Sequence, residues 1–202
     1  MDLLEQLRGE RGLMAVAEAL EELGEARDAN VISSVLSLVD RSRGMFVDGG
    51  RTRAMNFLGR VGGREAIEGL ARATRHDSMS QLSAIVALSN IPDPLIVRPV
   101  LEGLGPSVNA VSQTAAEALA RLDESVLYQG LLISLESDFP YACGKAVQSI
   151  AYYATDGRAA DQLQVVARGD VRGRVRREAQ RALEHLTLKN QLIEWAQGEE
   201  NA

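Results

Sequence analysis

The feature that most constrains the fold of this 202-residue chain is an internal repeat of about 31 residues. Two series of apolar residues, offset from each other by about twelve residues, recur with this spacing. The repeat therefore predicts one structural unit copied along the chain. The first series pairs an alanine with a leucine or isoleucine four residues later, at Ala54/Leu58, Ala84/Leu88, Ala115/Leu119, Ala146/Ile150 and Ala179/Leu183. The second series is Leu70, Val100, Leu131 and Leu163.

Each repeat is expected to contain two short helices. The first helix places apolar residues at i, i+3, i+4 and i+7, a spacing that gives a helix one apolar face. Second helices are predicted over 65–74, 94–104, 125–135 and 157–168. Gly62-Gly63 predicts a turn between helices, and Asp93-Pro94 predicts a helix start, with Asp93 as the N-cap. A lone helix pair cannot bury both of its faces, so the units are expected to stack.

The composition is that of a folded protein and disfavours several classes of function. Apolar residues make up 46% of the chain, charged residues make up 25%, and the net charge is −6. These values exclude wholesale disorder and disfavour a general binder of nucleic acid or membrane surfaces. No apolar stretch approaches the roughly 20 residues of a membrane-spanning helix. No secretory signal is evident, so the sequence predicts a cytoplasmic protein.

The segments DVRGRVRREAQRALEHL and PSVNAVSQTAAEALARLDE resemble the short HEAT-like repeats of bacterial proteins such as the phycobilisome lyases. The resemblance covers residues 51–202 and implies an all-α fold, a right-handed α-solenoid of stacked helical hairpins. Residues 1–50, with predicted helices over 3–7, 12–23 and 28–39 and a loop over 40–50, are interpreted as an atypical N-terminal cap. We therefore expect five repeats in one continuous solenoid, at about 51–76, 77–105, 106–137, 138–169 and 170–202.

The resemblance also implies that the second helix of each repeat lines a concave face. Positions two residues before and after each apolar residue of the second series would then face a groove. The residues at these positions have mixed charges and are aliphatic at one end, which suits a helix or peptide of a partner protein. Ile133 and Val165 are equally compatible with burial against the next repeat. The predicted partner-binding stripe is Glu68, Arg72, Arg98, Glu102, Tyr128, Gln129, Ile133, Asp161 and Val165.

Two further clusters are candidate contact sites. A basic patch lies in the last repeat, where arginines at a helix start oppose the helix dipole and suit an acidic protein or a phosphate; a solvated surface is the alternative interpretation. Tyr152 and Tyr153 form an aromatic corner, and because neighbours on a helix diverge by about 100°, one of them should be exposed. Residues 1–30 contain eight acidic residues. Attraction between these acids in one copy of the chain and the basic patch in another is a route to self-association. The patch is Arg172, Arg174, Arg177 and Arg181.

The sequence contains no convincing catalytic constellation. His76 and His185 lie three to four repeats apart, His185 is expected at a helix end, and Cys143 is expected to be packed. Phosphate-loop, dinucleotide-binding and HExxH motifs are absent from the sequence. We expect a non-enzymatic scaffold or adaptor for another protein, in bacterial signalling or complex assembly, with no cofactor and no metal. The alternatives are a nucleic-acid-binding protein that uses the arginine clusters over 41–64 and 168–181, a lyase-like chaperone for a prosthetic group, and a DNA-glycosylase-like enzyme.

Overall fold

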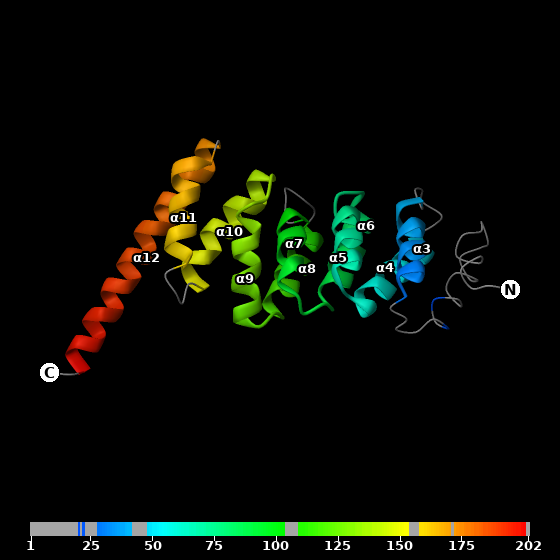
Figure 1. The fold of residues 1–202 in the computed structure, drawn as a ribbon, viewed down its shortest axis with the longest axis horizontal. Coiled ribbons are helices and arrows are strands. Elements are labelled where there is room, and N and C mark those ends of the chain that lie inside the picture. Colours follow the sequence, from blue (N-terminus) through cyan, green and yellow to red (C-terminus); the bar gives the residue numbers. More distant parts are fainter. Residues whose placement is uncertain are drawn as a thin grey trace. The chain divides into compact units, whose positions relative to one another are not determined.

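The computed structural model of the chain describes residues 20, 22, 28–41, 48–103, 109–153, 158–170 and 172–200. Within these ranges the protein is all-α: ten α-helices and one turn of 3-10 helix are present, and no strand (Figure 1). The chain divides into two compact units, unit 1 over Met1–Leu122 and unit 2 over Asp123–Ala202. The boundary between the units falls inside the third predicted repeat, 106–137.

Unit 1 is built from helices that alternate along the chain as the repeat predicts. The first helix of each pair packs on the next first helix, so that α4 contacts α6 and α6 contacts α8. The second helices, α5 and α7, pack beside them. The elements are α3 (Ala29–Arg41), α4 (Asp48–Val61), α5 (Arg64–Ala73), α6 (Ser78–Leu88), the 3-10 turn η1 (Pro94–Ile96), α7 (Val97–Gly103) and α8 (Asn109–Ala120).

The helices of unit 1 begin and end where the sequence supplies caps and turns. The Asp93 carboxylate accepts the Leu95 N–H at 2.8 Å, so Asp93 caps η1 with Pro94 in the first helical position, as predicted. Asp77 caps α6 in the same way by accepting the Met79 and Ser80 N–H groups. Gly62 and Gly63 adopt φ values of 65° and 82°, which only glycine adopts without strain, and this pair makes the turn between α4 and α5.

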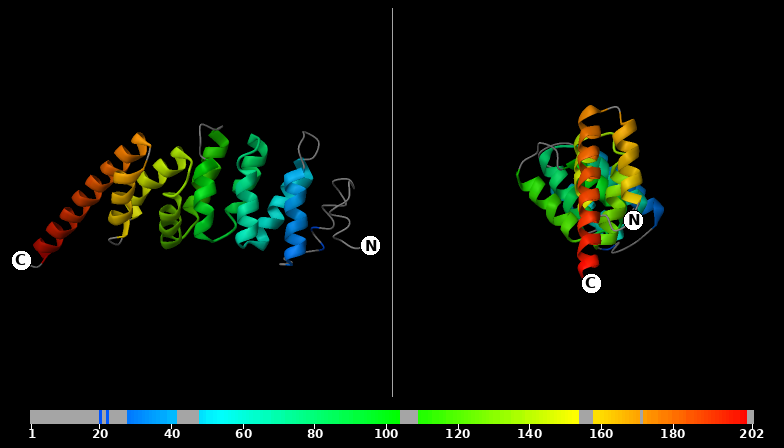
Figure 2. Two further views of the ribbon diagram at one scale, coloured as in Figure 1. Left: turned by 45° about the horizontal axis from the view of Figure 1, so that its top comes forward. Right: turned by 90° about the vertical axis from the view of Figure 1, so that its left-hand side faces the viewer.

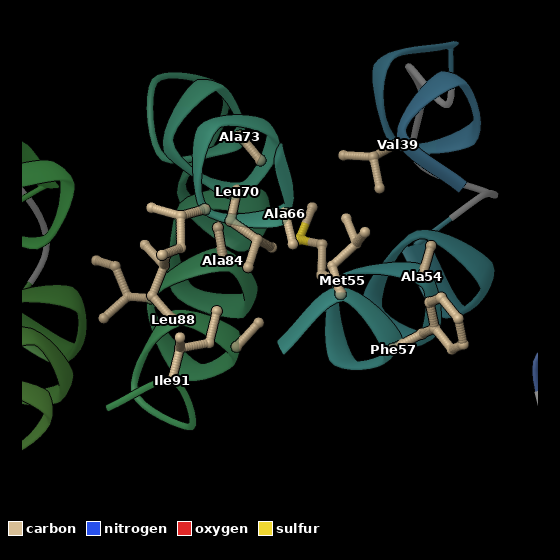
Figure 3. Close-up of a cluster of buried hydrophobic side chains, with 14 of the residues drawn as sticks. Val39, Ala54, Met55, Phe57, Ala66, Leu70, Ala73, Ala84, Leu88 and Ile91 are labelled. Atoms are coloured by element: carbon tan, nitrogen blue, oxygen red, sulfur yellow. The ribbon is translucent and has the colours of Figure 1, made fainter. Parts of the chain in front are cut away.

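The predicted apolar series form the core of unit 1. Ala54, Leu58, Ala84 and Leu88 from the first series and Leu70 from the second are completely buried. Figure 3 shows such side chains, Met55 and Leu70 among them, turned toward the space between their helices. α4 and α6 approach each other closely at Gly59, where an added Cβ would meet the Ala87 carbonyl oxygen at 2.5 Å. Small residues at fixed positions are therefore what permits the close approach of the first helices.

Unit 2 contains α9 (Glu124–Ser134), α10 (Pro140–Tyr153), α11 (Arg158–Gly169) and α12 (Gly173–Glu200). α10 contacts all three other helices, and α11 packs on α12 (Figure 2). Leu131, Ala146, Ile150, Leu163 and Ala179 of the two predicted series are buried here as well.

Three expectations need correction. The predicted loop over 40–50 is wrong at both ends, because Asp40 and Arg41 belong to α3 and Asp48–Gly50 belong to α4. The fifth repeat holds one 28-residue helix, α12, in place of two short helices. His185 consequently lies inside that helix and not at its end. Predicted helix 28–39 corresponds to α3, whereas 3–7, most of 12–23 and the loop residues 42–47 lie outside the described residues.

Candidate functional site

A cleft of about 360 Å³ opens in unit 1 between α5 and the η1–α7 segment. Two rows of polar side chains face each other across it, one from α5 and the turn that follows and one from α7. The first row follows from the amphipathic sequence of α5: Ala66, Ile67 and Leu70 are buried, so Arg64, Glu68 and Arg72, spaced four residues apart, fall on the opposite side. We call this site the arginine cleft; its lining is Arg64, Ile67, Glu68, Ala71, Arg72, Arg75, Leu95, Arg98, Pro99 and Glu102.

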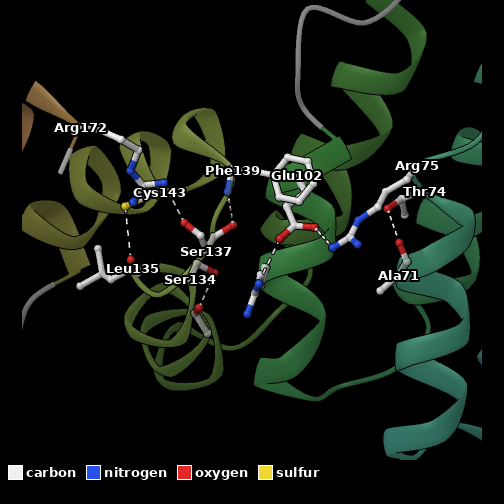
Figure 4. A network of polar contacts seen from close by, with 12 residues as sticks. Ala71, Thr74, Arg75, Glu102, Ser134, Leu135, Ser137, Phe139, Cys143 and Arg172 are labelled. Atoms are coloured by element: carbon white, nitrogen blue, oxygen red, sulfur yellow. Dashed lines mark hydrogen bonds and ion pairs between the residues drawn. The ribbon is translucent and has the colours of Figure 1, made fainter. Parts of the chain in front are cut away.

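The centre of the polar network is Glu102, whose side chain is only 2% exposed. One carboxylate oxygen accepts a hydrogen bond from Arg75 Nη2 at 2.8 Å, and the other accepts one from Arg98 Nε at 3.0 Å (Figure 4 shows the first of these). Arg75 comes from the turn after α5 and Arg98 from α7, so the carboxylate joins the two sides of the cleft. A buried carboxylate is tolerated because charged donors on both sides compensate its lost hydration.

The other arginines of the cleft make weaker, more exposed contacts. Arg64 Nε lies 3.2 Å from a Glu68 carboxylate oxygen, and Arg72 Nη2 lies 3.4 Å from Asp40 of α3. Exposed pairs of this kind contribute little to stability because water screens them. Four arginines and two glutamates give the lining a net charge of +2, in a chain whose net charge is −6. Ile67, Ala71, Leu95 and Pro99 supply apolar surface to the same lining.

The structure therefore brings together four of the nine residues in the predicted stripe: Glu68, Arg72, Arg98 and Glu102. Sequence reasoning missed Arg64 and Arg75 in this site, although the spacing of Arg64, Glu68 and Arg72 along one helix was available in the sequence. It also treated Glu102 as a groove residue, whereas the side chain is buried between two arginines.

The five remaining stripe residues lie in unit 2, on α9 and α11. Tyr128, which the sequence analysis placed in the partner-binding stripe, is only 4% exposed, so its side chain is buried and does not face a groove. It lies three residues before Leu131, so the two side chains share the buried face of α9. The guanidinium of Arg158 lies 6.0 Å from the Tyr128 ring centre. Gln129, Asp161 and Val165 are exposed, and Ile133 is half-buried.

One member of the predicted basic patch has a structural role. Arg172 precedes α12, and its side chain is 24% exposed. It donates to both carboxylate oxygens of Asp170. Through Nη1 it also donates to the Ser137 carbonyl at 2.9 Å (Figure 4). The Arg172 side-chain hydrogen bond holds the pKa of Asp170 below its ordinary value of 3.8, against the opposing effect of burial. Arg172 thus ties the turn before α10 to the turn before α12, a structural role that the predicted basic patch did not include.

The rest of the patch is exposed on α12. Arg174, Arg177 and Arg181 lie on the solvent side of the helix, and Arg174 pairs with Glu178 at 3.0 Å. The backbone of Tyr152 and Tyr153 ends α10, but their side chains lie outside the described residues, so the aromatic corner stays a prediction.

The nucleophilic and metal-binding candidates give no site in the described part of the chain. Cys143 is buried, and burial raises the pKa of its thiol, which donates to the Leu135 carbonyl at 3.3 Å. Cys143 is thus packed, as expected. Among the described residues, no group of three or more His, Cys, Asp or Glu side chains is arranged to hold a metal ion. None of the described helices has the length and apolar character needed to cross a membrane.

Comparisons with known proteins add little to this geometry. No protein-family model matches the chain. No curated protein matches it either. Among solved structures, the chain is similar to an engineered protein determined by a structural genomics consortium, with 19% sequence identity and a TM-score of 0.41. That similarity covers 93% of this chain and 97% of the engineered one.

Proposed function

We propose that this protein is a non-enzymatic interaction scaffold or adaptor of the HEAT-like type, a right-handed α-solenoid whose second helices present a surface to another protein. Within that surface, the arginine cleft binds an acidic segment of the partner. The observation that carries the proposal is the set of four arginines that line one cleft together with apolar side chains.

The chemistry of the cleft suits a carboxylate-rich peptide. Guanidinium groups present paired N–H donors that match the two oxygens of a carboxylate, and arginine is enriched at protein interfaces. Ile67, Leu95 and Pro99 offer contact area to the aliphatic parts of a bound segment. Because Glu102 already holds Arg75 and Arg98 in place, less side-chain entropy is lost when a ligand binds.

The same lining argues against nucleic acid as the ligand. Glu68 and Glu102 lie in the cleft, and a phosphate backbone would meet these carboxylates as well as the arginines. Sequence-independent binding of nucleic acid requires many basic side chains that contact phosphates and are not already paired with acidic side chains. The chain as a whole is acidic. A peptide can place single carboxylates beside single arginines and so avoid the two glutamates.

The test is calorimetric titration of the full chain with a peptide rich in Asp and Glu. A second peptide of equal length, with Asn and Gln in place of the acids, reports binding that does not need charge. We expect the acidic peptide to bind and the neutral one to bind far more weakly. Arg98→Ala should weaken binding about tenfold, because a hydrogen bond to a charged group contributes about 1.5–3 kcal/mol.

The matched control is Arg121→Ala, which removes an exposed arginine of unit 1 that does not line the cleft. It should bind like the unsubstituted chain. Equal losses for Arg98→Ala and Arg121→Ala would contradict the proposed site, and equal binding of both peptides would contradict the proposed chemistry. Binding of single-stranded DNA that is tighter than binding of the acidic peptide would favour the nucleic-acid alternative.

A further inference from the structure

A second cleft, of about 340 Å³, opens in unit 2 between α10 and α12. These two helices pack directly on each other, so the cleft belongs to one compact unit. It shares no residue with the arginine cleft, whose lining lies entirely in unit 1. Small-molecule sites are clefts of about 300–1,000 Å³ with a few placed polar groups, and this volume falls within that range. We call it the α10–α12 cleft; its lining is Pro140, Tyr141, Gly144, Lys145, Gln148, Arg174 and Glu178.

Gly144 shapes the wall that α10 gives to this cleft. Tyr141, Gly144 and Gln148 follow one another along one face of α10 at spacings of three and four residues, so the glycine leaves a gap between two larger side chains. The Glu178 carboxylate of α12 occupies this gap, because a Cβ added at Gly144 would lie 2.5 Å from Glu178 Oε2. The Glu178 side chain is 13% exposed, whereas that of Arg174 is 79% exposed. Glu178 therefore lies deep in the cleft and Arg174 lies at its rim.

The charges that line the cleft do not balance. Arg174 Nε donates to Glu178 Oε1 at 3.0 Å, so these two charges compensate each other. Lys145 Nζ lies 3.5 Å from Gln148 Oε1 and 5.7 Å from the centre of the Tyr141 ring, an arrangement that orients the ammonium by a cation–π contact. No carboxylate in the described part of the chain forms an ion pair with Lys145. One positive charge is therefore left over in the cleft, on a half-buried lysine.

We propose that the α10–α12 cleft binds a small monocarboxylic acid with an apolar body. A single carboxylate neutralises the charge left over at Lys145, whereas a phosphate dianion would add a second negative charge beside Glu178. The carboxylate accepts from the Lys145 ammonium and from the terminal Nη groups of Arg174, whose paired donors match two carboxylate oxygens. The apolar body packs on Pro140 and on the ring of Tyr141, which is 42% exposed.

The first experiment titrates the full chain with 3-phenylpropionate and follows the backbone amide chemical shifts. We expect saturable shifts that concentrate in residues 140–148 and 174–178. Two related compounds separate the two parts of the ligand. 3-Phenylpropanamide keeps the ring and the shape but has no charge, and it should bind at least about tenfold more weakly because its charged hydrogen bonds are lost. Acetate keeps the charge but has no apolar body, and it should also bind at least about tenfold more weakly.

Variants of the lining test the site itself. Lys145→Gln removes the uncompensated charge and should weaken the binding of 3-phenylpropionate at least about tenfold. Tyr141→Ala should also weaken binding, whereas Tyr141→Phe keeps the ring and should retain it. The matched control is Arg168→Gln, which removes one positive charge from an exposed residue of α11 outside the cleft and should leave binding unchanged. Circular dichroism should show the same helix content in every variant.

Four results would overturn the proposal. The first is a chain that does not bind 3-phenylpropionate at about 10 mM. The second is equal binding of the acid and its amide, which would show that the carboxylate is not recognised. The third is equal losses for Lys145→Gln and Arg168→Gln, which would place the binding outside the cleft. The fourth is tighter binding of phenyl phosphate, a dianion, which would contradict the charge balance. None of these results bears on the arginine cleft, because the two sites lie in different units.

Discussion

The two units each contain an arginine–carboxylate network, and the networks differ in what they leave accessible. In unit 1 one buried carboxylate, Glu102, is shared by Arg75 and Arg98, whose side chains are 48% and 34% exposed and line a cleft. In unit 2 one arginine, Arg172, is itself 24% exposed and donates to Asp170 and to a main-chain carbonyl. The first arrangement positions arginines at a surface, whereas the second uses an arginine to hold two turns together.

Arginines have different roles in the two networks, although the residue type is the same. A guanidinium has five N–H donors, and their partners determine whether the group faces a ligand or the protein. Arg172 donates to the main-chain carbonyl of Ser137, so its partner is part of the protein itself. Arg98 directs Nε toward Glu102 from a helix that lines an open cleft. Arg172 therefore holds two turns of unit 2 together, whereas Arg75 and Arg98 of unit 1 line an open cleft.

The largest expected effect is that of Arg172→Ala on stability. It leaves Asp170, whose side chain is 9% exposed, and the Ser137 carbonyl without this partner, and it should lower the free energy of unfolding by about 2–4 kcal/mol. Denaturant unfolding followed by circular dichroism measures the change. Arg177→Ala removes an exposed arginine of α12 as a control and should cost less than about 0.5 kcal/mol. Equal losses in the two variants would contradict the structural role of Arg172.

A smaller effect is expected from Glu102→Gln in unit 1. The substitution keeps the shape of the side chain but leaves Arg75 and Arg98 without their shared negative charge. Because both arginines reach solvent, the loss should be about 1–2 kcal/mol, less than that for removing a partner from a fully buried pair. The same denaturant titration measures it. A loss larger than that of Arg172→Ala would reverse the comparison between the units.

The smallest expected effect is the dependence of stability on acid. The Arg172 hydrogen bond lowers the pKa of Asp170, and the Ser80 hydrogen bonds lower the pKa of Asp77. A carboxyl whose pKa is lower in the folded state than in the unfolded state stabilises the fold above the unfolded value, and that stability is lost as the pH falls through the folded value. We therefore expect stability to fall in acid, below about pH 4.

Asp170→Asn and Arg172→Ala should both flatten this acid dependence, because each removes the interaction that lowers the pKa of Asp170. Unfolding titrations at a series of pH values measure the slope for each variant. A slope that is unchanged in both variants would show that Asp170 does not contribute to it.

The sequence predicted the helices of the repeats well because their determinants are local. The alanine–leucine series marks buried positions, Asp93 and Pro94 supply a cap within two residues, and Gly62 with Gly63 supply a turn. Each signal acts within one helical turn or at one fixed spacing. Positions two residues from Leu70 and Val100 supply Glu68, Arg72, Arg98 and Glu102 to the lining of the arginine cleft, and Glu102 among them is buried.

The sequence failed where a side chain is positioned by a distant part of the chain. Arg172 depends on the Ser137 carbonyl, 35 residues away, and Glu102 depends on Arg75, 27 residues away. No local pattern records either contact. Tyr128 is a different case, because its spacing of three residues from Leu131 already placed it on the buried face of α9.

The most direct test of the account is a map of backbone amide chemical shifts in the full chain as an acidic peptide is added. We expect shifts that concentrate in residues 64–75 and 95–102, the two sides of the arginine cleft, with little change around Asp170 and Arg172. Shifts that concentrate on α12, or that spread evenly over both units, would contradict the assignment of recognition to the cleft.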